Sequence, residues 1–248
     1  MERIRANPRL RVVTYNIHRS RGMDFRVRPE RIIDVLREID ADIVALQEIV
    51  ANQIGYLTER IGLPYHVFGK TSLLHGDDYG NLTLSRFPVV HSANFDISVP
   101  RRSRRGCLRT DVEAPGIGLM HVFHVHLGTS FFERRRQALR LLSREMIVNR
   151  TLTGPRLVLG DFNEWTRGLV TRMLSAQLES ADVRFHLQRK RTYPGMLPFF
   201  HLDHIYYDPE LKLESLSIHR SPKALLASDH LPLVGDFTWN SAKNAIAV

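Results

Sequence analysis

Polar side chains that could carry out metal-assisted chemistry stand at the ends of apolar stretches in this sequence. The clearest case is the motif Gly160-Asp161-Phe162-Asn163, which follows the apolar run Leu157-Val158-Leu159. A buried strand that delivers polar groups at its carboxyl end is a common way for an α/β protein to build a site. Asp161 and Asn163 are two residues apart, so both would point the same way if the strand geometry persists. The same residue types are frequent in Asx turns, and this stretch alone leaves both readings open.

Other apolar stretches also have polar side chains at their boundaries. These side chains are Asn16, Glu48, His126, Asp203, Asp229 and His230. With Asp161 and Asn163 they supply carboxylates, amides and imidazoles. An oxygen-rich set of this kind suits Mg²⁺ or Mn²⁺, whereas a structural zinc site would want cysteines or a close histidine pair on a helix. The adjacent residues Ser228-Asp229-His230 do not readily form a nucleophilic triad, because neighbouring side chains in an extended segment diverge.

The first part of the chain predicts a strand, a helix and a second strand that bring two of these residues together. Residues 10–16 are typical of a strand ending at Asn16, and the polar residues 17–24 indicate a loop. Pro29 opens a helix whose isoleucines and leucine, at positions 32, 33, 36 and 39, are spaced for one apolar face. Residues 42–48 predict a second buried strand. Such a unit makes neighbouring parallel strands, so we expect Asn16 and Glu48 at the same edge of one sheet.

The middle of the chain predicts several strands with short connections. A short helix is expected over 53–61. Within the segment 79–88, a turn is expected at Gly80-Asn81, and the residues after it alternate as in a strand. The expected strands are 65–69, 79–88, 89–97, 107–113 and 117–127, and the short connections from residue 79 onward imply an antiparallel meander. The arginine-rich residues 100–105 would form an exposed loop.

A long helix is predicted over residues 132–149, with Leu139, Leu142 and Met146 on one face. It leads into the strand that ends at Asp161. The remaining expected elements are a helix over 166–175, strands over 202–208, 211–218 and 231–237, and a tail from residue 239. The pattern predicts one domain over residues 1–248, a mixed α/β sandwich with parallel and antiparallel strands.

Composition bounds the class of protein. The 248 residues are 43% hydrophobic and 25% charged, which are ordinary values for a globular protein. No apolar run approaches the length of a membrane span, and the first residues lack the apolar stretch of a signal peptide, so we expect a cytoplasmic protein. A single cysteine, Cys107, excludes an internal disulfide and fits a reducing compartment.

The net charge of +9 comes largely from clustered arginines. The clusters are Arg101-Arg102-Ser103-Arg104-Arg105, Arg134-Arg135-Arg136 and Arg189-Lys190-Arg191. Such an excess favours a polyanionic partner, either nucleic acid or the anionic face of a membrane. A basic solvated surface without a binding role is the alternative for each cluster.

Seven motifs along the chain resemble, in the same order, those of the endonuclease/exonuclease/phosphatase family, also called DNase I-like. They are Thr14-Tyr15-Asn16, Leu46-Gln47-Glu48, Gly80-Asn81 with Leu84-Ser85-Arg86-Phe87-Pro88, His124-Val125-His126-Leu127-Gly128, Gly160-Asp161-Phe162-Asn163, Leu202-Asp203-His204-Ile205 and Ser228-Asp229-His230 with Pro232. The resemblance implies a four-layer α/β/β/α sandwich of two mixed β-sheets. It also implies metal-dependent hydrolysis of a phosphoester at one edge.

The resemblance assigns roles position by position. Glu48 is similar to the carboxylate that holds Mg²⁺ (or Mn²⁺), with Asn16 and Asp229 in or near the same coordination sphere. Among the catalytic positions, His230 resembles the family's histidine and Asp203 the acidic residue that orients it. The remaining roles fall to Asp161 and Asn163, which resemble the pair that positions water and phosphate, and to His126, which resembles a phosphate-contacting residue. Either His230 or Asp161 could serve as the base.

The identities of individual residues within the motifs bear on the class of substrate. His18 and His126 stand where abasic-site endonucleases usually carry an acid and a tyrosine, which argues against abasic-site repair. The motifs look closer to small bacterial members of the family and to phosphodiesterases acting on lipids or glycolipid anchors. We therefore expect a magnesium-dependent phosphodiesterase acting on a phosphate-containing substrate, either a phospholipid or glycolipid head group or a nucleic acid. Peripheral contact to an anionic membrane is a further expectation. A nuclease on DNA or RNA and a non-catalytic anion-binding module on the same fold are the alternatives.

Overall fold

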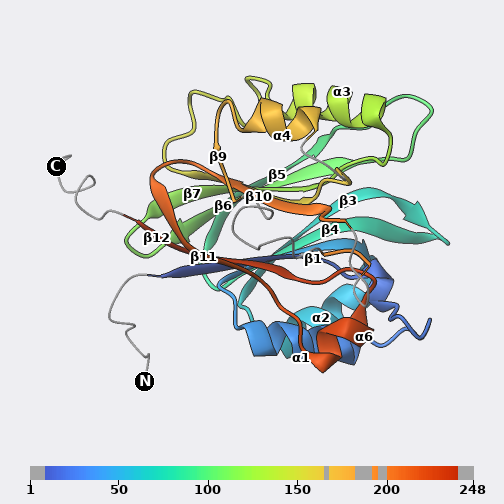
Figure 1. Cartoon of the computed structure of the whole chain (residues 1–248). Coiled ribbons are helices and arrows are strands. Elements are labelled where there is room, and N and C mark those ends of the chain that lie inside the picture. The colour runs from blue at the N-terminus through green and yellow to red at the C-terminus, as the bar shows by residue number, and fades with distance from the viewer. Residues whose placement is uncertain (1–8, 165–167, 182–191, 195–199, 240–248) are drawn as a thin grey trace.

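The chain folds into two six-stranded sheets packed face to face, with helices on both outer faces (Figure 1). The structure is a computed structural model, and it describes residues 9–164, 168–181, 192–194 and 200–239. Helices α3 and α4 cover one sheet, and helices α1, α2 and α6 cover the other. This arrangement confirms the predicted four-layer α/β/β/α sandwich of mixed sheets.

The first sheet has the strand order β11 (Leu211–Ile218), β12 (Leu233–Trp239), β1 (Leu10–Asn16), β2 (Ile43–Val50), β4 (Asp77–Ser85) and β3 (Tyr65–Leu74). The second has the order β5 (Val89–Asp96), β6 (Gly106–Ala114), β7 (Gly118–His126), β8 (Arg156–Asp161), β10 (Asp203–Tyr207) and β9 (Glu179–Ser180). The helices are α1 (Pro29–Ile39), α2 (Ile54–Ile61), α3 (Phe131–Leu141), α4 (Leu169–Leu174) and α6 (Pro222–Ala227), with short 3-10 turns η1 (His18–Ser20) and η2 (Ala51–Gln53).

Each sheet contains one parallel pair of strands, and a helix connects the two strands of each pair. Strands β1 and β2 are parallel and joined through α1, and strands β7 and β8 are parallel and joined through α3. The first unit confirms the predicted strand, helix and strand at the start of the chain. The predicted meander is only partly right, since β5, β6 and β7 are antiparallel neighbours while β4 belongs to the other sheet, between β2 and β3.

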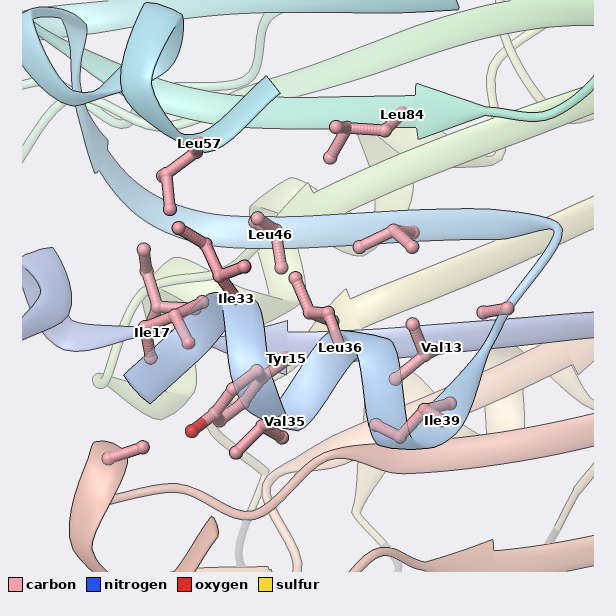
Figure 2. Close-up of a cluster of buried hydrophobic side chains, with 14 of the residues drawn as sticks. Val13, Tyr15, Ile17, Ile33, Val35, Leu36, Ile39, Leu46, Leu57 and Leu84 are labelled. Carbon is pink, nitrogen blue, oxygen red and sulfur yellow. The ribbon is translucent and has the colours of Figure 1, made fainter. Parts of the chain in front are cut away.

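Three apolar layers hold the sandwich together. One lies between the first sheet and its helices, one between the two sheets, and one between the second sheet and α3 and α4. Because side chains alternate along a strand, β1 contributes Val13 and Tyr15 to the first layer and Leu10 and Val12 to the second. Helix α1 begins at Pro29, as predicted. It buries one apolar face, made of the predicted isoleucines and leucine, against the first sheet (Figure 2).

The predicted helix over 132–149 is wrong in its length and in its buried face. Helix α3 ends at Leu141, after which the chain folds back in tight turns and Met146 and Ile147 enter the core. Leu139 lies in solvent, whereas Gln137 and Glu133 are buried. The Gln137 side chain accepts a hydrogen bond from the Gly128 backbone N–H and donates one to Glu133, a polar attachment that apolar spacing does not reveal.

The turn predicted at Gly80-Asn81 is also wrong. Both residues lie inside β4, and the β3–β4 hairpin instead turns at His75 and Gly76, which have φ values of 50° and 92°. Gly80 is required inside the strand, because a Cβ there would lie 2.0 Å from the Gly69 carbonyl oxygen. A glycine next to an asparagine therefore marked a close approach of two strands instead of a turn.

The other expected boundaries differ from the structure by a few residues. β3 runs five residues further than predicted, to Leu74, β12 begins at Leu233, and α4 begins at Leu169. Of the helix predicted over 166–175, residues 166 and 167 lie outside the described part, as do the cluster Arg189-Lys190-Arg191 and most of the predicted tail. Across the described ranges, no helix has both the length and the apolar character needed to span a bilayer.

Candidate functional site

The candidate site lies where the layer between the two sheets changes from apolar to polar. Along β1 the inward-facing residues are Leu10, Val12, Thr14 and Asn16, and β8 contributes Leu157 and Leu159 before Asp161. β7 follows the same order, with Met120 and Val122 before His124 and His126. Because parallel strands end at the same edge, the apolar filling of the sandwich gives way to a polar group on each strand.

Strand pairing in the second sheet brings three of the predicted residues side by side. Asp161 lies opposite His126 in the parallel ladder of β7 and β8, and opposite Asp203 in the antiparallel ladder of β8 and β10. The antiparallel direction of β10 explains why an acidic residue at the start of a strand reaches the same edge as residues at the ends of others. His126, Asp161 and Asp203 are all buried.

A β-bulge directs Glu48 towards this edge. Between Leu46 and Ile49, three steps along β2 match only two along β4, so β2 carries one extra residue. Glu48 has a φ of 62°, a left-handed conformation that is uncommon for a residue other than glycine. Bulges of this kind re-aim a side chain, and here the half-buried Glu48 carboxylate accepts a hydrogen bond from the Asn16 Nδ2 at 3.1 Å.

An Asx turn fixes the end of β8. The strand stops at Asp161, and the Asn163 backbone N–H donates to Asp161 Oδ1 at 2.9 Å with Asn163 at a φ of 48°. Strand geometry therefore does not persist to Asn163, and the Asx turn that the sequence left open as the alternative is the one that forms. The Asn163 side chain instead donates to the Leu127 carbonyl oxygen at 2.9 Å and fastens the turn to the end of β7.

Asn16 joins the two sheets at the site. Its Nδ2 lies 3.1 Å from Glu48 Oε1 and 3.1 Å from Asp161 Oδ2, one carboxylate from each sheet. Its Oδ1 accepts a hydrogen bond from the His18 backbone N–H at 3.0 Å. The amide thus holds two acidic side chains close together that would otherwise repel each other.

His230 is held by Asp203 and faces Asp161. Its Nδ1 lies 3.0 Å from Asp203 Oδ2, and its Nε2 lies 3.8 Å from Asp161 Oδ2. Burial by itself lowers the pKa of His230, but the charge of Asp203, the hydrogen bond with it and the charge of Asp161 raise that pKa to about 10. His230 is therefore a buried imidazolium at neutral pH.

Burial acts in the opposite sense on its neighbours. It raises the pKa of Asp161 to about 7, an effect that the Asp203 charge adds to and the His230 charge opposes. His126 lies with Nε2 3.5 Å from Asp161 Oδ2, and its pKa is well below the usual value because of burial first and the charges of Arg105 and His230 next. The site thus places a neutral imidazole and a charged imidazolium on either side of one readily protonated carboxylate.

Asp229 lies at the margin of this cluster. Ser228 Oγ donates to the Asn16 backbone oxygen at 2.8 Å and lies 3.3 Å from Asp229 Oδ1, so the β1 end and the segment before β12 are joined. Asp229 Oδ2 lies 3.5 Å from His18 Nδ1. The eight predicted site residues therefore occupy one region, with Asn163 and Asp229 in supporting contacts.

Sequence reasoning missed three residues at the site. Arg105, counted before only as part of a basic cluster, has an Nη1 3.4 Å from His126 Nδ1. Burial first, and the nearby negative charge of Glu48 next, raise the pKa of Tyr79. The Tyr193 ring lies 4.9 Å from the His230 ring. Each lies far from its partner in sequence. The local signals were the place of Arg105 two residues before the strand predicted from residue 107 and the place of Tyr193 shortly before the Leu202-Asp203 motif.

A buried polar cluster lies beneath the site, between the sheets. His124, Gln47 and Thr83 belong to it, with His124 Nε2 2.6 Å from Gln47 Nε2 and His124 Nδ1 3.1 Å from Thr83 Oγ1. Gln47 also donates to Thr14 Oγ1 at 3.0 Å. His124 and Gln47 thus support the site from below.

The donor set fits a hard divalent cation better than zinc. Over the described ranges, no three His, Cys, Asp or Glu side chains are grouped closely enough to form a metal cage. Magnesium does not need such a cage, because it is commonly held by one or two carboxylates together with water and substrate phosphates. Glu48 and Asp161 converge on the Asn16 amide and supply carboxylates of that kind.

Comparison with known proteins agrees with this geometry. Residues 13–230 match the Endonuclease/Exonuclease/phosphatase family. The uncharacterized protein YbhP of Escherichia coli K12 is 31% identical to the chain over 248 residues, which covers 90% of this chain and 94% of YbhP. The range matched by the family includes every predicted site residue, from Asn16 to His230.

Solved structures show the same fold. A mannosyl-6-phosphatase from Bacteroides thetaiotaomicron superposes with a TM-score of 0.76 at 17% identity, covering 93% of this chain and 100% of that one. The catalytic domain of human Nocturnin, solved with a bound sulfate anion, superposes with a TM-score of 0.74 at 22% identity, covering 96% of this chain and 97% of that one. The chain belongs to the endonuclease/exonuclease/phosphatase family.

Proposed function

We propose that the protein hydrolyses a phosphodiester with the help of Mg²⁺ or Mn²⁺. The observation that carries the proposal is the continuous series of contacts from Asp203 through His230, Asp161 and Asn16 to Glu48. It places an imidazolium, a carboxylate of raised pKa and a second carboxylate at one sheet edge. The family relationship supports a phosphate-containing substrate. Two proteins of similar fold also support it, since one is a mannosyl-6-phosphatase and the other, Nocturnin, was solved with a bound sulfate anion.

The chemistry divides among these residues according to their charge. A divalent cation held by Glu48 and Asn16, with Asp229 nearby, would neutralise charge on the non-bridging phosphate oxygens. Asp161 is the better candidate for the base, because its pKa of about 7 suits it to take a proton from water near neutral pH. Water attacks phosphorus and passes a proton to Asp161, and the bond to the leaving oxygen breaks. The leaving oxygen takes a proton from solvent water, and Asp161 then returns its proton to solvent.

The imidazolium of His230 has a different role in this proposal. Asp203 holds the Nδ1 side of the ring, which leaves Nε2 to donate towards a phosphate oxygen and stabilise its negative charge. Arg105 lies beside His126 and can make a charge-assisted hydrogen bond to the same group. Asn163 keeps Asp161 in place through its backbone N–H.

The test is a screen of phosphodiester, phosphomonoester, nucleic-acid and phospholipid substrates with Mg²⁺, Mn²⁺ or EDTA. We expect activity on a diester that EDTA abolishes and that Asp161→Asn, Glu48→Gln and His230→Ala lower by a factor of about 10² to 10⁴. Calorimetric titration with Mg²⁺ should show weaker binding to Glu48→Gln, independently of turnover.

His121→Gln is a matched control. His121 forms a similar buried pair with Asp111, with His121 Nδ1 2.8 Å from Asp111 Oδ1. It lies on β7 five residues before His126, about 16 Å along the strand from the site. This variant should lose stability and keep its turnover. Full activity in EDTA, or in Glu48→Gln and Asp161→Asn, would contradict the proposal, and tight substrate binding without turnover would favour a non-catalytic module.

A nuclease is the second candidate, since the net charge of +9 favours a polyanion. Binding of a nucleic acid through arginines should weaken steeply with salt. Cleavage of DNA or RNA in the same screen, with no hydrolysis of the small-molecule diesters or the phospholipids, would select this candidate.

A further inference from the structure

A groove beside the candidate site has basic and apolar walls. It has a volume of about 690 Å³ and lies between helix α3 and the loop that joins β5 to β6. Its lining includes Arg101, Arg102, Phe132, Arg135, Arg136 and Leu139. In Figure 1 helix α3 lies on the outer face of the second sheet, on the opposite side of the molecule from α1 and α6. We call this groove, together with Phe131, the α3 face.

Large apolar side chains on the α3 face lie in solvent. Phe132 is 72% exposed, Leu139 is 57% exposed and Phe131 is 53% exposed. Phe132 and Leu139 are seven residues apart, with Arg136 between them, so the three share one side of the helix. Exposed apolar groups gathered on one helix face are typical of a surface that contacts another apolar phase.

The arginines of the α3 face carry charge without a counter-charge. Arg101, Arg102, Arg135 and Arg136 have no carboxylate within ion-pairing distance among the residues that the structure describes. Nearby arginines differ. Arg104 pairs with Asp96, Arg140 pairs with Glu145, and Arg134 donates to the backbone oxygens of Gly128 and Thr129. The α3 face therefore presents four arginines without an ion-pair partner around exposed apolar side chains, and the acidic residue in its lining, Glu133, is buried.

We propose that the α3 face binds the surface of an anionic phospholipid bilayer. Arginine guanidinium groups would contact lipid phosphates, while Phe131, Phe132 and Leu139 would enter the boundary between head groups and acyl chains. A nucleic acid would also meet the arginines, but it gains from aromatic rings on which bases stack, and Leu139 offers none. The mixture of an aliphatic group, two phenyl rings and cations matches a bilayer surface better.

The α3 face adjoins the candidate site at two points. The loop of residues 97–105 ends at Arg105, which lies 3.4 Å from His126, and α3 begins five residues after His126. A bilayer held on this face would lie next to the site. This consequence for catalysis rests on the proposed function, whereas binding to the bilayer does not.

The test is sedimentation of the protein with vesicles of phosphatidylcholine alone and with about 30% phosphatidylserine. We expect binding only to the anionic vesicles, weakened by salt. Each arginine near an anionic leaflet contributes about fivefold to the partition coefficient, so Arg135→Gln/Arg136→Gln should lower it by roughly thirtyfold. Arg28→Gln/Arg220→Gln removes two exposed charges from the α1 and α6 side and should retain most of the binding.

Insertion is tested separately from charge. Phe132→Trp places an exposed indole on the α3 face, and its fluorescence should shift to shorter wavelength on anionic vesicles and be quenched by brominated lipids. Equal loss of vesicle binding in the two double variants, or an unshifted indole, would overturn the inference. Loss of single-stranded oligonucleotide binding in Arg135→Gln/Arg136→Gln, measured by anisotropy, with no vesicle binding by the wild type, would overturn it in favour of a nucleic acid.

Discussion

His124 makes the stability of the folded protein dependent on pH. Its ring is fully buried between the sheets, and its contacts within the described residues are with the neutral groups of Gln47 and Thr83. Burial lowers the pKa of His124 from 6.5 to about 3. A proton therefore binds the unfolded chain in preference to the folded one. The contribution of His124 to stability is fully present above pH 6.5 and is lost progressively as the pH falls towards 3.

The size of this effect follows from the difference between the two pKa values. At about pH 5 the unfolded chain carries the proton and the folded chain does not, which lowers the free energy of unfolding by about 2 kcal/mol relative to neutral pH. Urea unfolding followed by circular dichroism at about pH 7.5 and about pH 5 measures the change. His124→Gln keeps a polar group in the cluster and cannot be protonated, so it should lose about 2 kcal/mol less than the wild type between the two conditions.

The comparison between variants isolates His124 from the other groups that titrate. His91→Gln is the control, because the His91 side chain is exposed to solvent in the folded protein and its replacement should leave the wild-type pH dependence in place. If the wild type and His124→Gln lose stability in parallel between the two pH values, the reasoning from burial is refuted.

Two further substitutions probe the frame of the site. Gly160→Ala should lower the free energy of unfolding by about 3 kcal/mol or more, because a Cβ at this φ of 150° would lie 1.9 Å from the Val125 carbonyl oxygen. Gly55→Ala on α2, where a Cβ meets nothing within 4 Å, is the control and should be neutral or slightly stabilising in the same thermal melts. Asp203→Asn should lower kcat by about 10² or more with little change in KM, because it removes the charge that holds His230 without touching the substrate. An unchanged kcat in steady-state assays of a folded Asp203→Asn protein would remove Asp203 from the mechanism.

The sheets and the positions of the site residues followed from the sequence because strand ends carry a local signal. Apolar runs that stop at Asn16 and Asp161 mark both the strand and the end of it that carries the candidate site. The parallel pairing of β1 with β2 was predictable from the helix between them. Family motifs then ordered the remaining residues.

Errors arose where a contact distant in sequence overrode a local pattern. Apolar spacing predicts Leu139 on the buried face of α3. The face that turns inward instead carries Gln137 and Glu133 beside Ala138 and Leu141. Gly80 was read as a turn because its close approach to Gly69 is visible only in the folded sheet. Arg105 and Tyr79 were missed for the same reason, since their partners His126 and Glu48 lie on other strands.

The left-handed backbone at Glu48 makes stability and the retention of its carboxylate favour different residues at position 48. A residue other than glycine at a φ of 62° carries a conformational cost of roughly 1 kcal/mol, which glycine would avoid. Selection for thermostability alone would therefore favour glycine at position 48, while selection for the proposed metal-assisted chemistry would keep the carboxylate. Laboratory evolution of this protein for heat resistance should be coupled to an activity screen, because the bulge offers a route to a more stable protein that lacks the Glu48 carboxylate.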